Sequence, residues 1–371
     1  MNILVFSWRD PKHPMAGGAE QVMHEHMKGW VKAGHNVTLF SSFFKGGRGQ
    51  ESLDGVKIIR HGSQIIGVHI LAFLWYSFSK HENFDLVVDQ FHGIPFFTPL
   101  FVRKPKLAVL QEVAKEVWLI NDLPRPFNIL VGWIGYITEP LVFLFYKNMM
   151  FMVGSNSARD DLIKIGIHQS RITIVPHGVI TPMIKKHPQK EKKKTVIFLG
   201  ALTRDKGIED ALASFSLLNK ERDYNFWVVG SGSPEYLQHL YRLAERLKIK
   251  DKVKLFGFVS QEKKFDLLAR SHVLVNPSVR EGWGLVNIEA NAMGTPVVAY
   301  KSQGLVDSVN DGKSGILCDT NNPESLARNT EGLLSDPRKY KDISQGAISW
   351  SKEFSWVKSK KLSLDIIEAL V

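Results

Sequence analysis

The chain has 371 residues, 44% hydrophobic and 23% charged, a length and composition that exclude a disordered protein and favour two domains. The single cysteine, Cys318, excludes an intramolecular disulfide and a cysteine-built metal site, and it suits a reducing compartment. The net charge of +11 favours anionic partners, either nucleotides or an acidic membrane surface, and no signature of a nucleic-acid-binding module accompanies it.

In the first half of the chain, short apolar segments alternate with segments of helical periodicity. The start, MNILVFSWRD, predicts a β-strand and not a signal peptide. Helices are predicted at 18–33 and 156–165. The predicted strands are 3–7, 36–41, 56–60, 85–90, 107–111, 151–154 and 172–176. This alternation predicts a parallel sheet that is covered by helices on both faces.

Residues 127–154 form the most apolar segment of the chain. Glu139 and Pro140 interrupt the run at its middle, so a membrane-spanning helix is disfavoured. A buried helix followed by a strand is the favoured interpretation. A helix that lies in a membrane interface is the second, and the apolar, aromatic segment 65–78 adds weight to it.

Proline and lysine then dominate residues 180–194, and helical or strand periodicity is lost. We therefore predict a linker at 183–194 between a first domain, 1–182, and a second domain, 195–353. The second domain repeats the pattern, with strands expected at 195–200, 225–230, 253–258, 272–276, 296–300 and 315–319. Its expected helices are 207–220, 234–248, 261–270, a helix from 286, 323–335 and 338–349, and a final helix at 356–370 follows a break.

Ligands of open α/β sheets bind at the carboxyl ends of the strands, so the loops there are the candidate sites. Gly17 and Gly18 precede a helix and could let backbone amides approach an anion, although a flexible helix start is the alternative. Arg204 and Lys206 follow a strand and could neutralise a diphosphate, although a solvated basic turn is the alternative. In GSGSPEYL (230–237) Glu235 replaces the third glycine of the dinucleotide fingerprint, which disfavours a nicotinamide site.

The segment REGWGLVNIEANAMGTPVVAY (280–300) combines two acids with a glycine turn at a helix start. Gly282–Leu285 is expected at the N-terminus of that helix, where free amides and the helix dipole favour an anion. Glu289 lies in the first two turns, where a carboxylate could accept hydrogen bonds from a ribose. Glu281 precedes the helix and could reach the other end of the same ligand. Together these groups describe a sugar-nucleotide site.

EGWGLVNIEANAMGTPVVA (281–299) resembles the glutamate-x7-glutamate motif of the retaining, nucleotide-sugar-dependent glycosyltransferases of the GT-B fold, in the large group-4 (glycosyl transferases group 1) family. The resemblance extends along nearly the whole chain, in the family's order. The other segments that carry it are GGAEQV (17–22), IVPHGV (174–179), Lys206-Gly207, GSGSPEYL (230–237), LFGFVS (255–260), DGKSGIL (311–317) and FSW (354–356).

The resemblance implies an α/β protein with two Rossmann-like domains that face each other across a cleft. The first domain would hold the acceptor, the second would hold the donor, and residues 354–371 would return to the first. By the same likeness Glu289 would bind the donor ribose, and Lys206 would pair with the diphosphate. Glu281 and the backbone of Gly282, Trp283, Gly284, Leu285 and Val286 would hold the sugar and diphosphate. Gly17 and Gly18 would close over the donor, and Phe258 and Val259 would line the base pocket.

The chain departs from the family pattern at two positions. Ala201 stands where an arginine is usual, and Arg204 is the candidate replacement. Gln111, followed by Glu112, stands where a histidine near the donor sugar is frequent; Gln111 could still hydrogen-bond a sugar, and His92 could take over part of the role. His177 is expected to be structural.

The resemblance therefore predicts a hexosyltransferase that uses a GDP- or UDP-hexose and transfers the sugar, with retention, to a glycan or lipid-linked acceptor. Neither a metal nor a cofactor beyond the co-substrate is expected. A cytoplasmic protein with peripheral contact to the anionic inner face of the membrane is expected, and no nucleic-acid partner. A nucleotide-sugar epimerase or hydrolase of the same fold, or a catalytically impaired sugar-nucleotide-binding protein, are the alternatives.

Overall fold

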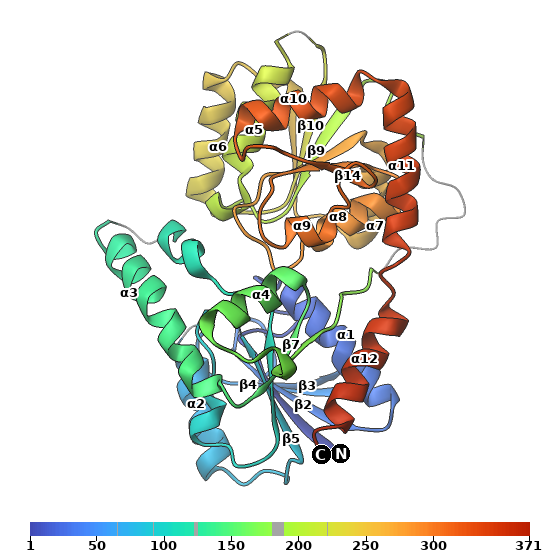
Figure 1. Cartoon of the computed structure of the whole chain (residues 1–371). Coiled ribbons are helices and arrows are strands. Elements are labelled where there is room, and N and C mark those ends of the chain that lie inside the picture. Colours follow the sequence, from blue (N-terminus) through green and yellow to red (C-terminus); the bar gives the residue numbers. More distant parts are fainter. Residues whose placement is uncertain (65, 92, 122–124, 180–188, 221) are drawn as a thin grey trace. The chain divides into compact units, whose positions relative to one another are not determined.

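The computed structural model describes all residues except 65, 92, 122–124, 180–188 and 221 (Figure 1). It divides into two compact units. Unit 1 comprises Met1–Gly178 and Ser355–Val371, and unit 2 comprises Val179–Phe354. Each is a β-sheet of mainly parallel strands covered by helices, as the alternating pattern predicts. Half of the expected linker 183–194, residues 183–188, lies outside the described residues.

Unit 1 is built on an eight-stranded sheet in the order β3-β4-β2-β1-β5-β6-β7-β8. The strands are β1 (Asn2–Phe6), β2 (Asn36–Ser41), β3 (Gln50–Leu53), β4 (Val56–Arg60), β5 (Leu86–Phe91), β6 (Lys106–Leu110), β7 (Met150–Val153) and β8 (Ile172–Ile174). All neighbouring pairs are parallel except β3 and β4, which form an antiparallel hairpin at the edge. No strand was predicted for β3, because its residues, QESL, are mainly polar and alternate between exposed and half-buried.

The two faces of this sheet pack against different helices. Ile3 and Val5 belong to the core under α1 (Gly18–Lys32) and α12 (Trp356–Glu368). Leu4 and Phe6 point to the other face and pack with α2 (Gly67–Phe78). The remaining helical segments are η1 (Thr98–Leu100), η2 (Lys115–Ile120), α3 (Phe127–Val142), η3 (Phe143–Tyr146), α4 (Asn156–Ile165) and η4 (Gln169–Arg171). The expected return of the C-terminal helix to the first domain is confirmed by α12.

The apolar segment 127–154 forms α3, η3 and β7, and the favoured prediction that its helix is buried is wrong. Among the described residues, Phe127–Tyr146 is the one helix whose length and composition would suffice to cross a membrane, and only 22% of its most apolar window is buried. Gly132, Gly135 and Glu139 are its buried positions within α3. They form a single narrow side that packs on η2, so the remaining apolar side chains face outward.

Unit 2 is built on a six-stranded, fully parallel sheet in the order β11-β10-β9-β12-β13-β14. Its strands are β9 (Thr195–Leu199), β10 (Asn225–Val229), β11 (Val253–Gly257), β12 (Val273–Asn276), β13 (Val297–Ala299) and β14 (Gly315–Leu317). Its helical segments are η5 (Arg204–Lys206), α5 (Ile208–Leu218), α6 (Pro234–Arg246), η6 (Lys250–Lys252), α7 (Gln261–Arg270), α8 (Leu285–Ala292), α9 (Leu305–Ser308), α10 (Pro323–Leu334) and α11 (Pro337–Ser351). The strand order reverses beside β9, so the loops after β9 and β12 meet at the carboxyl edge.

Candidate functional site

The loops that follow β9 and β12 contact each other directly. Gly207 ends η5 with a φ of +71°, and a Cβ at this position would lie 2.2 Å from the carbonyl oxygen of Pro277. Only glycine therefore allows the approach. The amide of Val279 donates to the carbonyl oxygen of Asp205 at 2.8 Å and joins the two loops.

This contact brings Lys206 to Glu281. Lys206 Nζ lies 3.1 Å from Glu281 Oε1, and the two side chains are 24% and 20% exposed, so the pair remains accessible from outside unit 2. Ser278 Oγ donates to the same carboxylate oxygen at 3.0 Å. The amide of Glu281 donates to the carbonyl oxygen of Gln303 at 3.1 Å, which holds the loop in place. A cation and a carboxylate are thus fixed side by side at the carboxyl edge of the sheet.

A series of buried, hydrogen-bonded polar side chains connects Glu281 to the interior of unit 2. Ser278 Oγ also lies 2.8 Å from Asn276 Oδ1. Asn276 Nδ2 donates to Asn287 Oδ1 at 2.9 Å, and Asn287 Nδ2 donates to Ser308 Oγ at 2.9 Å. The sequence analysis missed these residues. The sequence did contain one signal for them. Two asparagines stand at positions, one at a strand end and one in a helix, that are buried and would normally carry apolar side chains.

The glycine turn places the N-terminus of α8 next to the pair. Gly284 is the N-cap with a φ of +80°, and a Cβ there would lie 2.7 Å from Ser308 Oγ. The first-turn amides that follow, at Leu285 and Val286, have no acceptor within their own helix. The side chain of Trp283 is 4% exposed, and its ring packs edge-on against Phe354 at 4.8 Å between centroids. Trp283 can therefore offer a ligand its backbone and not its indole.

Glu289 lies on α8, and its carboxylate is buried. Lys264 Nζ, from α7, lies 2.5 Å from Glu289 Oε1. Burial raises the pKa of Glu289, and the charge and hydrogen bond of Lys264 oppose that rise. Lys264 was missed by the sequence analysis, because in EKKFDLL it reads as one more exposed lysine of an amphipathic helix. Lys264 therefore opposes protonation of a buried carboxylate at the position where a ribose is expected.

The other predicted donor-side residues lie at the same edge of unit 2. Phe258 follows β11 directly, and its ring is 87% exposed. Val259 is half-buried beside it and Gly282 is half-buried beside Glu281. Arg204 and Ala201 are both exposed in the segment after β9. The predicted donor-side residues of unit 2 therefore lie on the loops that follow β11, β9 and β12 and on α8.

In unit 1 the glycine pair begins α1, as predicted. Gly17 is the N-cap, and its amide donates to Glu20 Oε2 at 2.7 Å. Arg9 Nε donates to the other oxygen of the same carboxylate at 2.9 Å. Glu20 thus fixes the loop, and the Gly17 amide is engaged within it. The loop is also anchored by Asp10, whose buried carboxylate accepts from Arg60 Nε at 2.6 Å.

Gln111 follows β6 and is buried against His177. His177 Nε2 lies 2.9 Å from Gln111 Oε1, so the imidazole donates to the amide oxygen. Burial lowers the pKa of His177 to about 4. The same cause, reinforced by the neighbouring His177, lowers the pKa of His26 to about 3. Glu112 is half-buried in the next position, and His92 lies outside the described residues.

Two family-like segments that are far apart in the sequence meet in unit 1. A Cβ at Gly178, in IVPHGV, would lie 2.4 Å from the backbone nitrogen of Trp356, in FSW. The ring of Trp356 in turn contacts His26 edge-on at 5.6 Å between centroids. These segments therefore seat α12 on unit 1, and their packing gives them a structural role.

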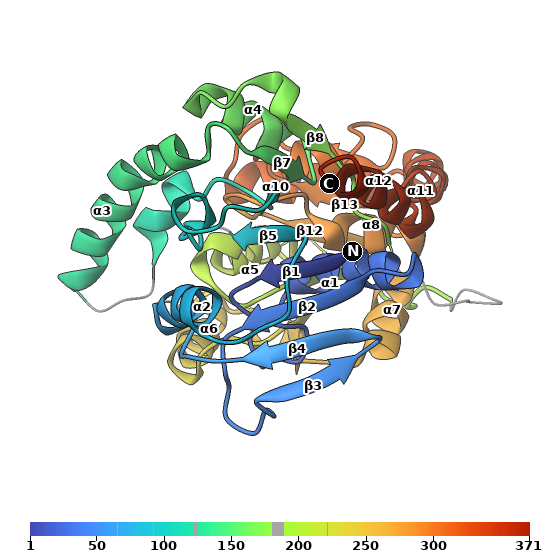
Figure 2. The same ribbon diagram turned by 90° about the horizontal axis from the view of Figure 1, so that it is seen from below.

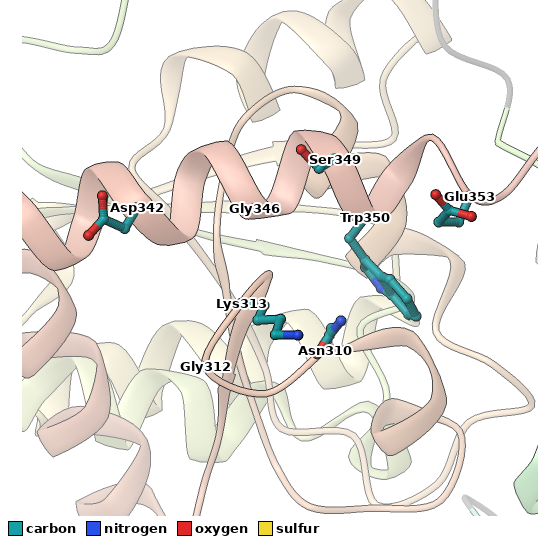
Figure 3. A pocket seen from close by; sticks show the side chains of 8 residues that line it. All are labelled: Asn310, Gly312, Lys313, Asp342, Gly346, Ser349, Trp350 and Glu353. Carbon is teal, nitrogen blue, oxygen red and sulfur yellow. The ribbon is translucent and has the colours of Figure 1, made fainter.

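Unit 2 also contains an open groove of about 590 Å³ between α11 and the loop before β14. Figure 3 shows Trp350 directed from α11 towards the loop that carries Asn310 and Lys313. Asp342, Ser349 and Glu353 line its α11 side. The groove shares no residue with the Lys206–Glu281 pair or with Glu289, so it is separate from the candidate site.

Two family models match the chain. The model "Glycosyltransferase Family 4" matches residues 16–181, and "Glycosyl transferases group 1" matches residues 179–350. The chain belongs to the group 1 glycosyltransferases. A solved sucrose-phosphate synthase from Thermosynechococcus elongatus is similar over 100% of this glycosyltransferase and 98% of its own chain, with a TM-score of 0.80 and 17% identity. The fold is therefore GT-B.

One more solved structure and one curated relative are similar to this glycosyltransferase. A solved structure of Anabaena Alr3699/HepE with UDP and glucose is similar over 100% of both chains, with a TM-score of 0.73 and 16% identity. A D-inositol 3-phosphate glycosyltransferase 2 from Catenulispora acidiphila is 39% identical over 137 residues, which are 37% of the glycosyltransferase and 32% of the relative. The matched regions span about a third to a half of the length of the curated relatives.

Proposed function

We propose that this glycosyltransferase moves a hexose from a GDP- or UDP-hexose to a hydroxyl group of a glycan or lipid-linked acceptor, with retention at the anomeric carbon. One observation carries the proposal. The Lys206–Glu281 pair, at 3.1 Å, adjoins the N-terminus of α8, and the same helix holds Glu289, which is paired with Lys264. Groups suited to a sugar, a diphosphate and a ribose thus lie close together on two loops and the helix α8 of unit 2.

Each group has a role that follows from its chemistry. Glu289 accepts hydrogen bonds from the ribose hydroxyls, and Lys264 favours its charged form for that purpose. The α8 amides and Lys206 neutralise the diphosphate as negative charge develops on the leaving group. Glu281 accepts a hydrogen bond from the transferred sugar, and Ser278 and Lys206 fix its orientation.

The proposed reaction occurs on one face of the sugar. The bond between the anomeric carbon and the donor phosphate oxygen breaks, and a bond from the acceptor oxygen to the same carbon forms. The acceptor proton passes to the phosphate oxygen that leaves, so the products are the glycosylated acceptor and a nucleoside diphosphate. Lys206, Arg204 and the α8 dipole supply positive charge, so we propose that no metal is required. Loss of activity with a chelator and recovery with magnesium or manganese would overturn that point.

The comparisons support a nucleotide-sugar donor. HepE, which shares the fold, was solved with UDP and glucose, and the Catenulispora relative is named as a glycosyltransferase that acts on an inositol phosphate. A thermal-shift screen against UDP, GDP and their sugars decides the base, because a ligand that binds only the folded protein raises its melting temperature. We further propose that the protein works in the cytoplasm, at the inner face of the membrane.

The test of the proposed roles compares Glu289→Gln with Glu281→Gln. Glu289→Gln is expected chiefly to raise the donor KM, and Glu281→Gln is expected chiefly to lower kcat. Glu245→Gln serves as the matched control, because Glu245 is 52% exposed on α6, away from the site. Wild-type kinetics in both site variants would refute the assignment. Donor consumption without any acceptor would instead indicate an epimerase or hydrolase, and donor binding without turnover would indicate an impaired binding protein.

A further inference from the structure

The exposed large hydrophobic side chains of unit 1 are concentrated on two helical segments. Of the 29 such side chains among the described residues, α2 supplies five and Phe127–Tyr146 supplies eleven. Figures 1 and 2 both show α2 and α3 on the same side of unit 1. Scattered exposed apolar residues are ordinary on a soluble protein, but such a concentration marks an interaction surface.

Aromatic contacts join these segments into one surface. The ring of Phe73, on α2, meets Phe101 edge-on at 5.2 Å between centroids. Phe97, at the other end of η1, meets Phe145 of η3 at 6.1 Å. Leu100 lies between Phe97 and Phe101 in the sequence and is 63% exposed. We call the outward side of α2, η1, α3 and η3 the apolar platform.

The inner sides of the same segments are fixed to the sheet. Val68 and Ala72 of α2 pack with Phe6, and Tyr146 of η3 packs with Phe91. The platform is therefore a rigid part of unit 1, built from the successive connections β4–β5, β5–β6 and β6–β7.

The anchoring of α3 argues against a membrane-spanning role. Glu139 is 3% exposed and accepts from the amides of Ala114 and Lys115 at 2.7 and 2.8 Å. A Cβ at Gly135 would lie 2.3 Å from the indole of Trp118, so helix and η2 are in tight contact. A helix that crossed a bilayer would lose these contacts and carry an unpaired carboxylate into hydrocarbon. Lying flat, α3 keeps its polar side on the protein and its apolar side outward.

Charge is arranged around the platform and not on it. Within α2 and Phe127–Tyr146 the buried Glu139 is the only Asp, Glu, Lys or Arg. Exposed cations lie just beyond the ends of α2, η1 and Phe127–Tyr146: Lys80, Arg103, Arg125 and Lys147. Among the residues that the structure describes, the exposed acids closest in sequence are Glu116 on η2 and Glu82, which pairs with Lys57 at 3.8 Å; Asp122 lies outside the described residues. Apolar rings bordered by cations fit a bilayer that carries anionic lipids.

A protein partner fits this surface less well. Interfaces between proteins carry about one hydrogen bond per 100–200 Å². The outward side offers few polar groups for that purpose, and the hydroxyl of Thr138 already donates to the carbonyl oxygen of Ile134 at 2.7 Å.

We propose that the apolar platform docks unit 1 on the surface of an anionic phospholipid bilayer, with α2 and α3 lying in the interface. The docking follows from unit 1 alone, and only its consequence for the acceptor rests on the proposed function. Because the β6–β7 connection runs from Gln111 at the carboxyl edge of the sheet into η2 and α3, docking would present lipid-linked hydroxyl groups near that edge.

The test measures binding of the full chain to vesicles of phosphatidylcholine alone and to vesicles of phosphatidylcholine mixed with the anionic lipid phosphatidylglycerol. The platform variant combines Phe78→Gln, Ile134→Gln and Ile137→Gln, at positions that are 76%, 52% and 61% exposed. The matched control combines Tyr241→Gln, Val357→Gln and Leu362→Gln, which are 49%, 80% and 42% exposed outside the platform. Circular dichroism verifies that all proteins are folded.

The wild type and the control are expected to bind anionic vesicles, and the platform variant is expected to bind at least about tenfold more weakly. Replacing Arg103 and Arg125 with Gln should weaken binding to anionic vesicles and leave binding to phosphatidylcholine vesicles unchanged. Equal vesicle binding by all proteins, or none by the wild type, would overturn the proposal. A wild-type dimer that only the platform variant dissociates, without vesicle binding, would assign the platform to a second copy of the chain and also overturn it.

The vesicle experiment needs neither donor nor acceptor, so its failure is distinct from failure of the proposed reaction. A Lys206→Ala variant provides the converse measurement. It is expected to lose transfer and to bind vesicles like the wild type. If it lost both, the platform would not act independently of unit 2, and the proposal would fail.

Discussion

The ion pair between Lys264 and Glu289 makes a sharp prediction for the variant Lys264→Met. Methionine retains much of the apolar stem of lysine and removes its charge. The Glu289 carboxylate is then left buried with its main counter-charge gone, since Lys264 Nζ lies 2.5 Å from its Oε1. The variant should therefore lose both stability in unit 2 and affinity for the donor.

The magnitude follows from burial. Removing one partner of a fully buried ion pair costs about 3–5 kcal/mol. Lys264 is 15% exposed and Glu289 is 8% exposed, so water compensates part of the loss, and about 2 kcal/mol is expected. For a unit of this size each kcal/mol lowers the melting temperature by about 2–4 °C, so the shift should be about 4–8 °C.

The loss of stability in Lys264→Met should depend on pH, and the sign of that dependence follows from the pKa of Glu289. Burial already raises the pKa of Glu289 above its ordinary value, and the loss of Lys264 raises it further. At a pH above the pKa that Glu289 has in the unfolded chain, the folded variant binds more protons than the unfolded variant. The stability that the variant loses relative to the wild type therefore grows as pH rises. The destabilisation should therefore be larger at pH 8 than at pH 5.

Calorimetric or fluorescence melting of the wild type, Lys264→Met, Glu289→Gln and the double variant tests this reasoning as a double-mutant cycle. Glu289→Gln removes the buried charge, so the double variant should recover most of the lost stability. Additive losses in the double variant, or a melting shift that is the same at pH 5 and pH 8, would refute the view that Lys264 chiefly compensates the Glu289 charge.

Three further predictions concern unit 1, each measured by thermal unfolding of the full chain. Gly178→Ala should cost about 1–3 kcal/mol because its Cβ would lie 2.4 Å from the Trp356 backbone, whereas Gly332→Ala, with nothing within 4 Å in α10, should be neutral or stabilising. His177 is held neutral because burial lowers its pKa to about 4, so the unfolded chain binds the extra proton and stability should fall as pH drops from 6.5 to about 4, by up to about 3 kcal/mol. His177→Gln should reduce that slope and leave the part due to His26, whose pKa burial lowers to about 3; an unchanged slope would contradict the account. Arg60→Met should cost about 3–5 kcal/mol, because it leaves the Asp10 carboxylate buried and unpaired, and Arg60→Met with Asp10→Asn should be less damaged than Arg60→Met alone.

Most of the secondary structure could be predicted from the sequence because buried parallel strands are short apolar runs between turns. The predicted segments 36–41, 56–60, 156–165 and 261–270 agree with the structure at both ends. The failures have a common cause. β3 lacks apolar alternation, and α3 has an excess of it, so hydrophobicity alone predicted no strand in the first case and a buried helix in the second.

The candidate site was predictable only where a motif carries it. The glycine turn and the two glutamates are adjacent in sequence, so their shared geometry follows from one helix start. Lys264 lies 25 residues from Glu289, and Ser308 lies 21 residues from Asn287. Their partnerships depend on how α7 and α9 pack against α8, and a sequence pattern carries no information about which exposed-looking lysine ends beside a buried acid.

The two glutamates of the motif have different surroundings in the structure, and these suit different roles. Glu281 is partly exposed and forms an ion pair with Lys206 on the adjacent loop. Glu289 is buried and forms an ion pair with Lys264 on a neighbouring helix. A carboxylate that must exchange partners during a reaction needs access, and one that recognises a fixed ribose needs a constant charge and position. The difference in burial therefore gives a physical reason for assigning Glu281 to the reacting sugar and Glu289 to the nucleoside, which the spacing of the motif alone does not provide.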